Sequence, residues 1–216
     1  MIKATDIKSV FPTLTQKNPV WFHSDEKVNI PVGSHKSDRF KFNNPICEVC
    51  NTNRTAQHDK SWEKVSAHLK QYDLEVRGTL NIRLAKIFRD KIYTNALNVH
   101  LYFIKLFGCR IVESEIPIDT STFSDSIMTN TPNPYLFLRF KKAIGSREKM
   151  LSLSPVHIKQ KGSETVVAAW MYTVGQINVE LLYAPSGACN DFLKKSFNPI
   201  HQYKVLRVYD FETEDI

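Results

Sequence analysis

The sequence predicts an α+β protein in which a central helical layer, at about residues 60–108, packs on a largely antiparallel sheet from the C-terminal half. Two observations carry this prediction. Apolar residues recur at helical spacing through the middle of the chain, and β-branched and aromatic runs separated by turn residues fill the C-terminal half. The apolar fraction of 42% is ample for a core, and 216 residues fit one large domain.

The N-terminal region, residues 1–59, is predicted to be irregular and poor in strands. Four prolines punctuate it: Pro12, Pro19, Pro31 and Pro45. Each proline disfavours helix at its own position and at the preceding one. Residues 20–22 are predicted to form a short strand or a hydrophobic anchor.

Residues 36–42 alternate basic and aromatic side chains. On a strand, Phe40 and Phe42 would share one face, and Arg39 and Lys41 would share the other. Such a strand could stack bases on its aromatic rings and hold phosphates with its basic groups. The alternative is an ordinary half-buried strand with both phenylalanines in the core.

The α+β core, residues 60–211, is predicted to begin with three helices. The first carries Trp62, Val65 and Leu69 at helical spacing. The second carries an apolar stripe formed by Leu80, Leu84, Ile87, Phe88 and Ile92. The third, at residues 96–107, is apolar nearly all round, so we expect it to be buried, and Gly108 suits the position just after its end.

Strands are predicted at residues 110–115, 135–141, 164–174, 177–183 and 203–211. In the second of these strands, Leu136, Leu138 and Phe140 would share one face. A turn at Gly175 would join the next two strands into a hairpin. Residues 119–134 are rich in Ser, Thr, Asp, Asn and Pro, which predicts a mobile loop.

One short motif carries chemistry, the pair of Cys47 and Cys50 in the N-terminal region. The two-residue gap lets both thiolates point at one ion, so the pair has the form of a zinc knuckle. Zinc takes two further ligands in such sites, and we predict His58 and His68, with His35 as another candidate. A structural Zn²⁺ is therefore the predicted cofactor. A redox dithiol and unliganded thiols are the alternatives.

The charge distribution predicts a polyanion partner. The formal charge is +7, and residues 210–216 hold four acids and no base, so the rest of the chain carries +11. A basic body with an acidic tail, residues 212–216, suits a nucleic acid, with DNA favoured over RNA. The predicted nucleic-acid contacts are Lys36, Arg39, Phe40, Lys41, Arg54, Arg83, Lys86, Arg89, Arg139, Lys141 and Lys142. The predicted docking residues for a protein partner are Phe211, Glu212, Glu214 and Asp215.

We therefore expect a non-enzymatic nucleic-acid-binding protein of phage or viral type that acts in replication, recombination or transcription. One alternative is a metal-dependent nuclease, in which Glu113, Glu115 and Asp119 would hold a divalent cation. The other is an interaction protein that docks on a host or replisome partner through its acidic tail.

The sequence also bears on location. The N-terminus has no apolar signal-peptide core, and no apolar run is long enough to span a bilayer. We therefore expect a cytoplasmic protein, or one inside a host cell, with no membrane contact. The common phosphate-loop and hydrolase motifs are absent from the sequence.

Overall fold

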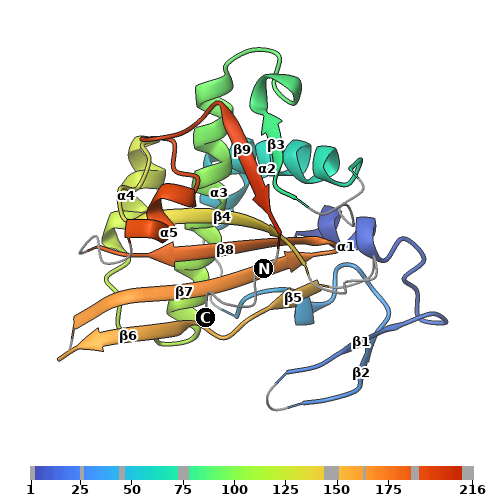
Figure 1. Cartoon of the computed structure of the whole chain (residues 1–216). Coiled ribbons are helices and arrows are strands. Elements are labelled where there is room, and N and C mark those ends of the chain that lie inside the picture. The colour runs from blue at the N-terminus through green and yellow to red at the C-terminus, as the bar shows by residue number, and fades with distance from the viewer. Residues whose placement is uncertain are drawn as a thin grey trace.

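The computed structural model of the chain describes residues 3–24, 27–43, 47–72, 78–143, 151–162, 164–185 and 190–210. It confirms an α+β fold. Helices α2 (Ala56–Leu69) and α3 (Ile92–Glu113) lie against one face of a seven-stranded sheet, as Figure 1 shows. A second, two-stranded sheet lies beside the large one. No helix in the described ranges is long and apolar enough to cross a membrane.

The large sheet is mixed. Its strands lie in the order β3 (Leu80–Arg83), β9 (Val205–Tyr209), β4 (Leu136–Lys142), β8 (Ile177–Tyr183), β7 (Glu164–Val174) and β5 (Leu151–Leu153), and β6 (His157–Lys161) also pairs with β7. All neighbours run antiparallel except β4 and β9, which run parallel. The last strand in the sequence is therefore inserted between two earlier ones.

The predicted hairpin is confirmed. The strand predicted at residues 135–141 is also confirmed and is β4. Strands β7 and β8 pair from Ala168↔Tyr183 to Val174↔Ile177, and the turn residue Gly175 has a φ of 58°. That positive φ is the conformation that glycine adopts at least cost.

The core is an aromatic cluster between the helices and the sheet. The ring of Trp62 on α2 lies 4.8 Å from that of Phe103 on α3, measured between centroids. It also lies 6.4 Å from Phe140 on β4 and 6.3 Å from Tyr172 on β7. The predicted burial of residues 96–107 is confirmed, because nearly all of this stretch of α3 is inaccessible.

The N-terminal region is more regular than predicted. It contains helix α1 (Ala4–Val10) and a hairpin of β1 (Val20–Phe22) and β2 (Ile30–Val32). The strand expected at residues 36–42 is wrong, because Ser37 caps a 3₁₀ turn at Asp38–Phe40. A turn of π-helix, Cys50–Arg54, leads into α2.

Three further predictions for the core are wrong. The stripe that begins at Leu80 is not one helix, since β3 is followed by a 3₁₀ turn at Leu84–Lys86. Residues 110–115 are not a strand, since α3 continues through Gly108 to Glu113. The expected loop at 119–134 contains helix α4 (Ser121–Thr129). Helix α5 (Asn190–Lys195) follows β8.

Candidate functional site: a basic groove on the outer face of the sheet

The sheet has one face toward α2 and α3 and an outer face that points away from them. Phe140 contacts the helical layer, so Phe137, Arg139 and Lys141 of β4 lie on the outer face. Strand β9 pairs in parallel with β4 through Phe140↔Val208, which places Arg207 on the outer face too. The register of β3 with β9, Asn81↔Arg207 and Arg83↔Val205, adds Arg83.

A basic groove of about 400 Å³ lies between the α5 segment and β9 on this face. Four basic side chains line it: Lys194, Lys195, His201 and Arg207. All four are exposed, and Phe137 and Val205 supply apolar wall. None of the described lining residues is acidic. Arg83 is exposed beside Val205, so it extends the basic surface along the edge of the sheet.

The sequence-based prediction missed most of this groove. Arg83, which extends the basic surface beyond the groove, was among the predicted contacts. The four basic residues that line the groove were not. The adjacent pair Lys194 and Lys195 and the alternation of Arg207 with apolar residues in β9 were the available signals. Neither signal shows that the end of α5, which follows β8, and strand β9 meet at one groove.

Three predicted contacts on β4 are buried cations that form ion pairs. Arg139 is 4% exposed, and its Nη2 and the Nζ of Lys141 lie 2.8 Å and 3.2 Å from Glu180 Oε2 on β8. Lys142 Nζ donates to Asp210 Oδ1 at 2.7 Å and to the carbonyl of Gly78 at 2.8 Å. These cations hold the sheet together, so we do not include them in the interface.

Asp210 was counted with the acidic end of the chain. In the structure it directly follows β9, and its carboxylate accepts hydrogen bonds from Lys142 and from the Gly78 amide. The docking residues predicted in the tail, Phe211, Glu212, Glu214 and Asp215, lie outside the described residues.

The predicted contacts in the N-terminal region border a different cleft. Arg39 and Lys41 line a cleft of about 530 Å³ together with Trp21 of β1. Phe40 is buried, so it cannot stack a base, whereas Trp21 is 60% exposed. Lys41 forms an exposed ion pair with Asp38 at 2.7 Å. Trp21 is therefore the most exposed of the described aromatic side chains that line this cleft.

The remaining predicted basic residues are exposed but scattered. Lys36 lies in the N-terminal region, and Lys86 and Arg89 follow β3. Arg54 Nη1 donates to the carbonyl of Met128 on α4 at 3.2 Å. Lys86 and Arg89 lie in the turn and loop that follow β3, so they do not share one face of the helix predicted from Leu80.

The two cysteines of the predicted knuckle lie together. The backbone N–H of Cys50 donates to Cys47 Sγ at 3.3 Å. Hydrogen bonds from the thiol and the amide of Cys50 lower the pKa of Cys47, and the thiol contact raises the pKa of Cys50. Cys47 is exposed and Cys50 is half-buried.

The predicted histidine ligands do not gather at the pair. His58 and His68 are ten residues apart on α2, which is about 15 Å along the helix axis, so they cannot bind one ion together. His68 hydrogen-bonds Tyr72, and His35 donates to the carbonyl of Phe11. Within the described ranges, no group of three or more His, Cys, Asp or Glu side chains could hold a metal. Zinc at Cys47 and Cys50 stays a prediction.

Two buried histidines are held neutral. Burial and the charge of Lys105 lower the pKa of His58 to about 4. Burial lowers the pKa of His100 to about 3, and its Nε2 accepts the backbone N–H of Asn133 at 3.3 Å. Both side chains therefore serve the core rather than a surface site.

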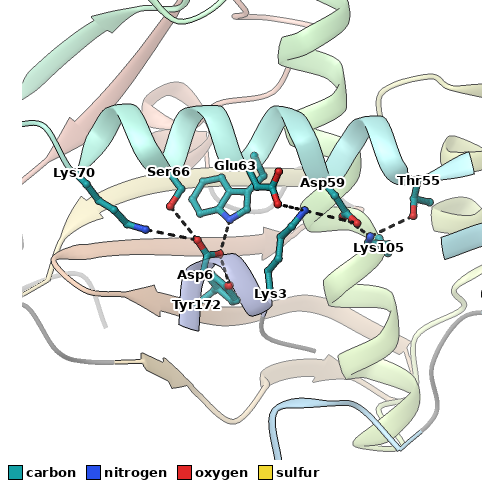
Figure 2. Close-up of polar contacts among 10 residues, drawn as sticks. Lys3, Asp6, Thr55, Asp59, Glu63, Ser66, Lys70, Lys105 and Tyr172 are labelled. Carbon is teal, nitrogen blue, oxygen red and sulfur yellow. Dashed lines mark hydrogen bonds and ion pairs between the residues drawn. The ribbon is translucent and has the colours of Figure 1, made fainter. Parts of the chain in front are cut away.

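A buried polar network joins the N-terminus to the core, as Figure 2 shows. The Asp6 carboxylate on α1 accepts from Trp62 Nε1 at 2.9 Å, Ser66 Oγ at 3.0 Å and the Tyr172 hydroxyl at 3.0 Å. The ammonium of Lys70 lies 3.8 Å away. This one side chain therefore links α1, α2 and β7.

A second part of the network is centred on Lys105 of α3. Its ammonium donates to Asp59 Oδ1 at 2.5 Å and to Thr55 Oγ1 at 3.2 Å (Figure 2). Lys3 lies 3.8 Å from Asp59 and 3.1 Å from Glu63. Burial lowers the pKa of Lys105 while Asp59 raises it. Each cation has an acidic partner, so we assign this cluster a structural role.

Comparisons with protein-family models, with curated proteins and with solved structures found no match to this chain.

Proposed function

We propose that this protein binds nucleic acid, DNA in the first instance, with the phosphate backbone in the basic groove. The observation that carries the proposal is the composition of that groove. Four exposed basic side chains converge on one concavity, and its described lining has no acid. The formal charge of +7 adds a long-range attraction for a polyanion.

The groove offers two kinds of phosphate contact. The guanidinium of Arg207 can donate two parallel hydrogen bonds to one phosphate, whereas Lys195 acts as a point charge. Each phosphate that a cation neutralises releases condensed counterions, so the affinity falls as salt rises. These contacts read no base, so we expect little sequence preference from the groove.

The Trp21 cleft supports the proposal as a site for unpaired bases. Its exposed indole lies with Arg39 and Lys41, which can neutralise neighbouring phosphates. Stacking of one base on an aromatic side chain contributes about 1–3 kcal/mol and tolerates any base. The proposed ligand therefore includes single-stranded segments.

Charge reversal in the groove tests this function. We expect Lys195→Glu with Arg207→Glu to weaken binding of a DNA oligonucleotide at least tenfold at about 0.1 M salt. The slope of log affinity against log salt should fall by about two, one for each lost phosphate contact. Fluorescence anisotropy over a salt series measures both quantities.

The matched control is Lys159→Glu with Lys161→Glu. These two lysines are exposed on β6, which pairs with β7 far from β9 in the strand order, and their reversal changes the net charge equally. Equal loss of affinity in both double variants would show that only net charge matters. Unchanged binding in the groove variant would refute the groove as the site.

A further inference from the structure

We propose that Cys47 and Cys50 form a redox dithiol that undergoes thiol–disulfide exchange with the disulfide of a small thiol or peptide. This activity is independent of the basic groove and of any nucleic acid. Cys47 is the attacking residue, because it is exposed, and Cys50 is the resolving residue, because it is half-buried.

The local backbone places the two sulfurs for a disulfide. The amide of Asn51 donates to the carbonyl of Cys47 at 2.9 Å, which closes one helical turn between the cysteines. Side chains three residues apart on such a turn have Cβ atoms about 5–6 Å apart, and a small adjustment brings them to disulfide distance. The contact of the Cys50 amide with Cys47 Sγ shows that the first sulfur already points back over the turn.

The exchange balances in two steps. Cys47 gives its thiol proton to solvent, and its Sγ attacks one sulfur of the partner disulfide, which releases the first partner thiol after protonation. Cys50 Sγ then loses its proton and attacks Cys47 Sγ, which releases the second partner thiol. The two cysteines are oxidised by two electrons, and the partner disulfide is reduced to two thiols.

The surroundings of the pair favour this chemistry over a closed metal site. His58 is buried on α2, and His68 and His35 are hydrogen-bonded elsewhere. Cys109, a third described thiol, is half-buried on α3, where it lines a cavity of about 200 Å³ together with Lys105. It is the natural internal reference for a cysteine outside the dithiol.

The test uses the reduced full-length protein with oxidised glutathione as the probe. We expect the wild type to form an internal Cys47–Cys50 disulfide, identified by alkylation and peptide mass spectrometry. Cys50→Ser should instead accumulate a glutathione mixed disulfide on Cys47, because the resolving thiol is gone. Cys47→Ser should react at least about tenfold more slowly, because Cys50 is less exposed.

Cys109→Ser is the control, and it should behave like the wild type. If Cys50→Ser forms no mixed disulfide, or if Cys109 takes up glutathione as fast as Cys47, the dithiol has no special reactivity and the proposal fails. It also fails if the protein purifies with one zinc per chain that protects both cysteines from oxidation. DNA affinity, measured in parallel, should not change in any of these variants, so the two proposals stand or fall separately.

Discussion

The role of a lysine or arginine in this protein depends on whether an acidic side chain lies close enough to form an ion pair with it. Arg139 and Arg207 lie on the same face of the sheet, yet Arg139 is buried against Glu180 while Arg207 borders the basic groove. The sequence shows both as basic residues that alternate with apolar ones. Only the strand register, which brings Glu180 opposite Arg139, separates the structural cation from the exposed one.

Asp6 is a buried carboxylate that accepts hydrogen bonds from three buried side chains, so its removal should destabilise the fold. We predict that Asp6→Ala lowers the free energy of unfolding by roughly 3–5 kcal/mol, because three buried donors would lose their acceptor. Urea denaturation measures this loss. Asp38→Ala, which removes an exposed carboxylate paired with Lys41, should leave the urea midpoint close to that of the wild type, because solvent screens an exposed pair. Similar losses in both variants would show that the buried hydrogen bonds of Asp6 do not stabilise the fold more than an exposed ion pair does.

At the scale of elements, the sequence predicts those whose signal is local. The β7–β8 hairpin was predicted at its observed bounds, because a run of strand residues, a glycine turn and a second run occur side by side. Strand β3 was mistaken for helix, because Leu80 and Leu84 are spaced as on a helix face. Its real partner, β9, lies more than a hundred residues later, and no local pattern reports that pairing.

Helix α4 was missed for a different reason. Its polar residues have weak helix propensity, and only Phe123 and Ser126 are buried. The helix forms because Phe123 packs against Phe107 and Tyr183, and because Asp119 accepts the Ser121 amide at 2.9 Å. Tertiary contacts of this kind override local propensity.

Gly108 was predicted to end α3, but it lies inside the helix. A Cβ added there would meet Phe123 Cδ2 at 3.7 Å, which is an ordinary contact. We therefore predict that Gly108→Ala raises the free energy of unfolding by about 0.5–1 kcal/mol, because alanine loses less backbone entropy in a helix. Thermal and urea unfolding of the variant measure the gain.

Gly33→Ala is the contrasting control for that prediction. Its added Cβ would lie 2.8 Å from the Cα of Gln16 and 2.9 Å from its nitrogen, so the backbone at the end of β2 would have to shift. This variant should be less stable than the wild type. A loss of stability in Gly108→Ala would show that α3 is too tightly packed at Phe123 to accept a methyl group.

At the scale of the whole molecule, the sequence predicted the sign of the surface charge but not its location. The excess of basic residues is plain from composition. The groove requires that the end of α5 and strand β9 meet on one face, which depends on the order of strands in the sheet. The candidate site was therefore predictable in chemical class and not in residues.

The fold as a whole should lose stability in mild acid because of His58 and His100. Their folded pKa values, about 4 and about 3, lie below the unfolded value near 6.5. Above pH 6.5 both states are neutral at these sites, so their contribution is fully present. Below it the unfolded chain binds protons that the folded chain excludes, and stability should fall by about 1.4 kcal/mol per pH unit for each histidine.

Urea denaturation between pH 8 and pH 5 measures this dependence. We expect little change from pH 8 to pH 7 and a steep fall from pH 6.5 to pH 5. In His100→Gln the free energy of unfolding should fall less steeply with pH, because only His58 still contributes its slope. This holds whatever the stability of the variant at pH 7. A variant with the same slope as the wild type would show that His100 is protonated equally in both states.

The place of β9 in the sheet has a consequence for biosynthesis. Strand β3 joins the large sheet through β9, which is made more than a hundred residues later on the ribosome. Until β9 emerges, the nascent chain presents the unpaired edge of β4 and the unattached β3 segment to chaperones and to other chains. The sheet can therefore be completed only after β9 has been synthesised, because β9 is the strand that joins β3 to β4.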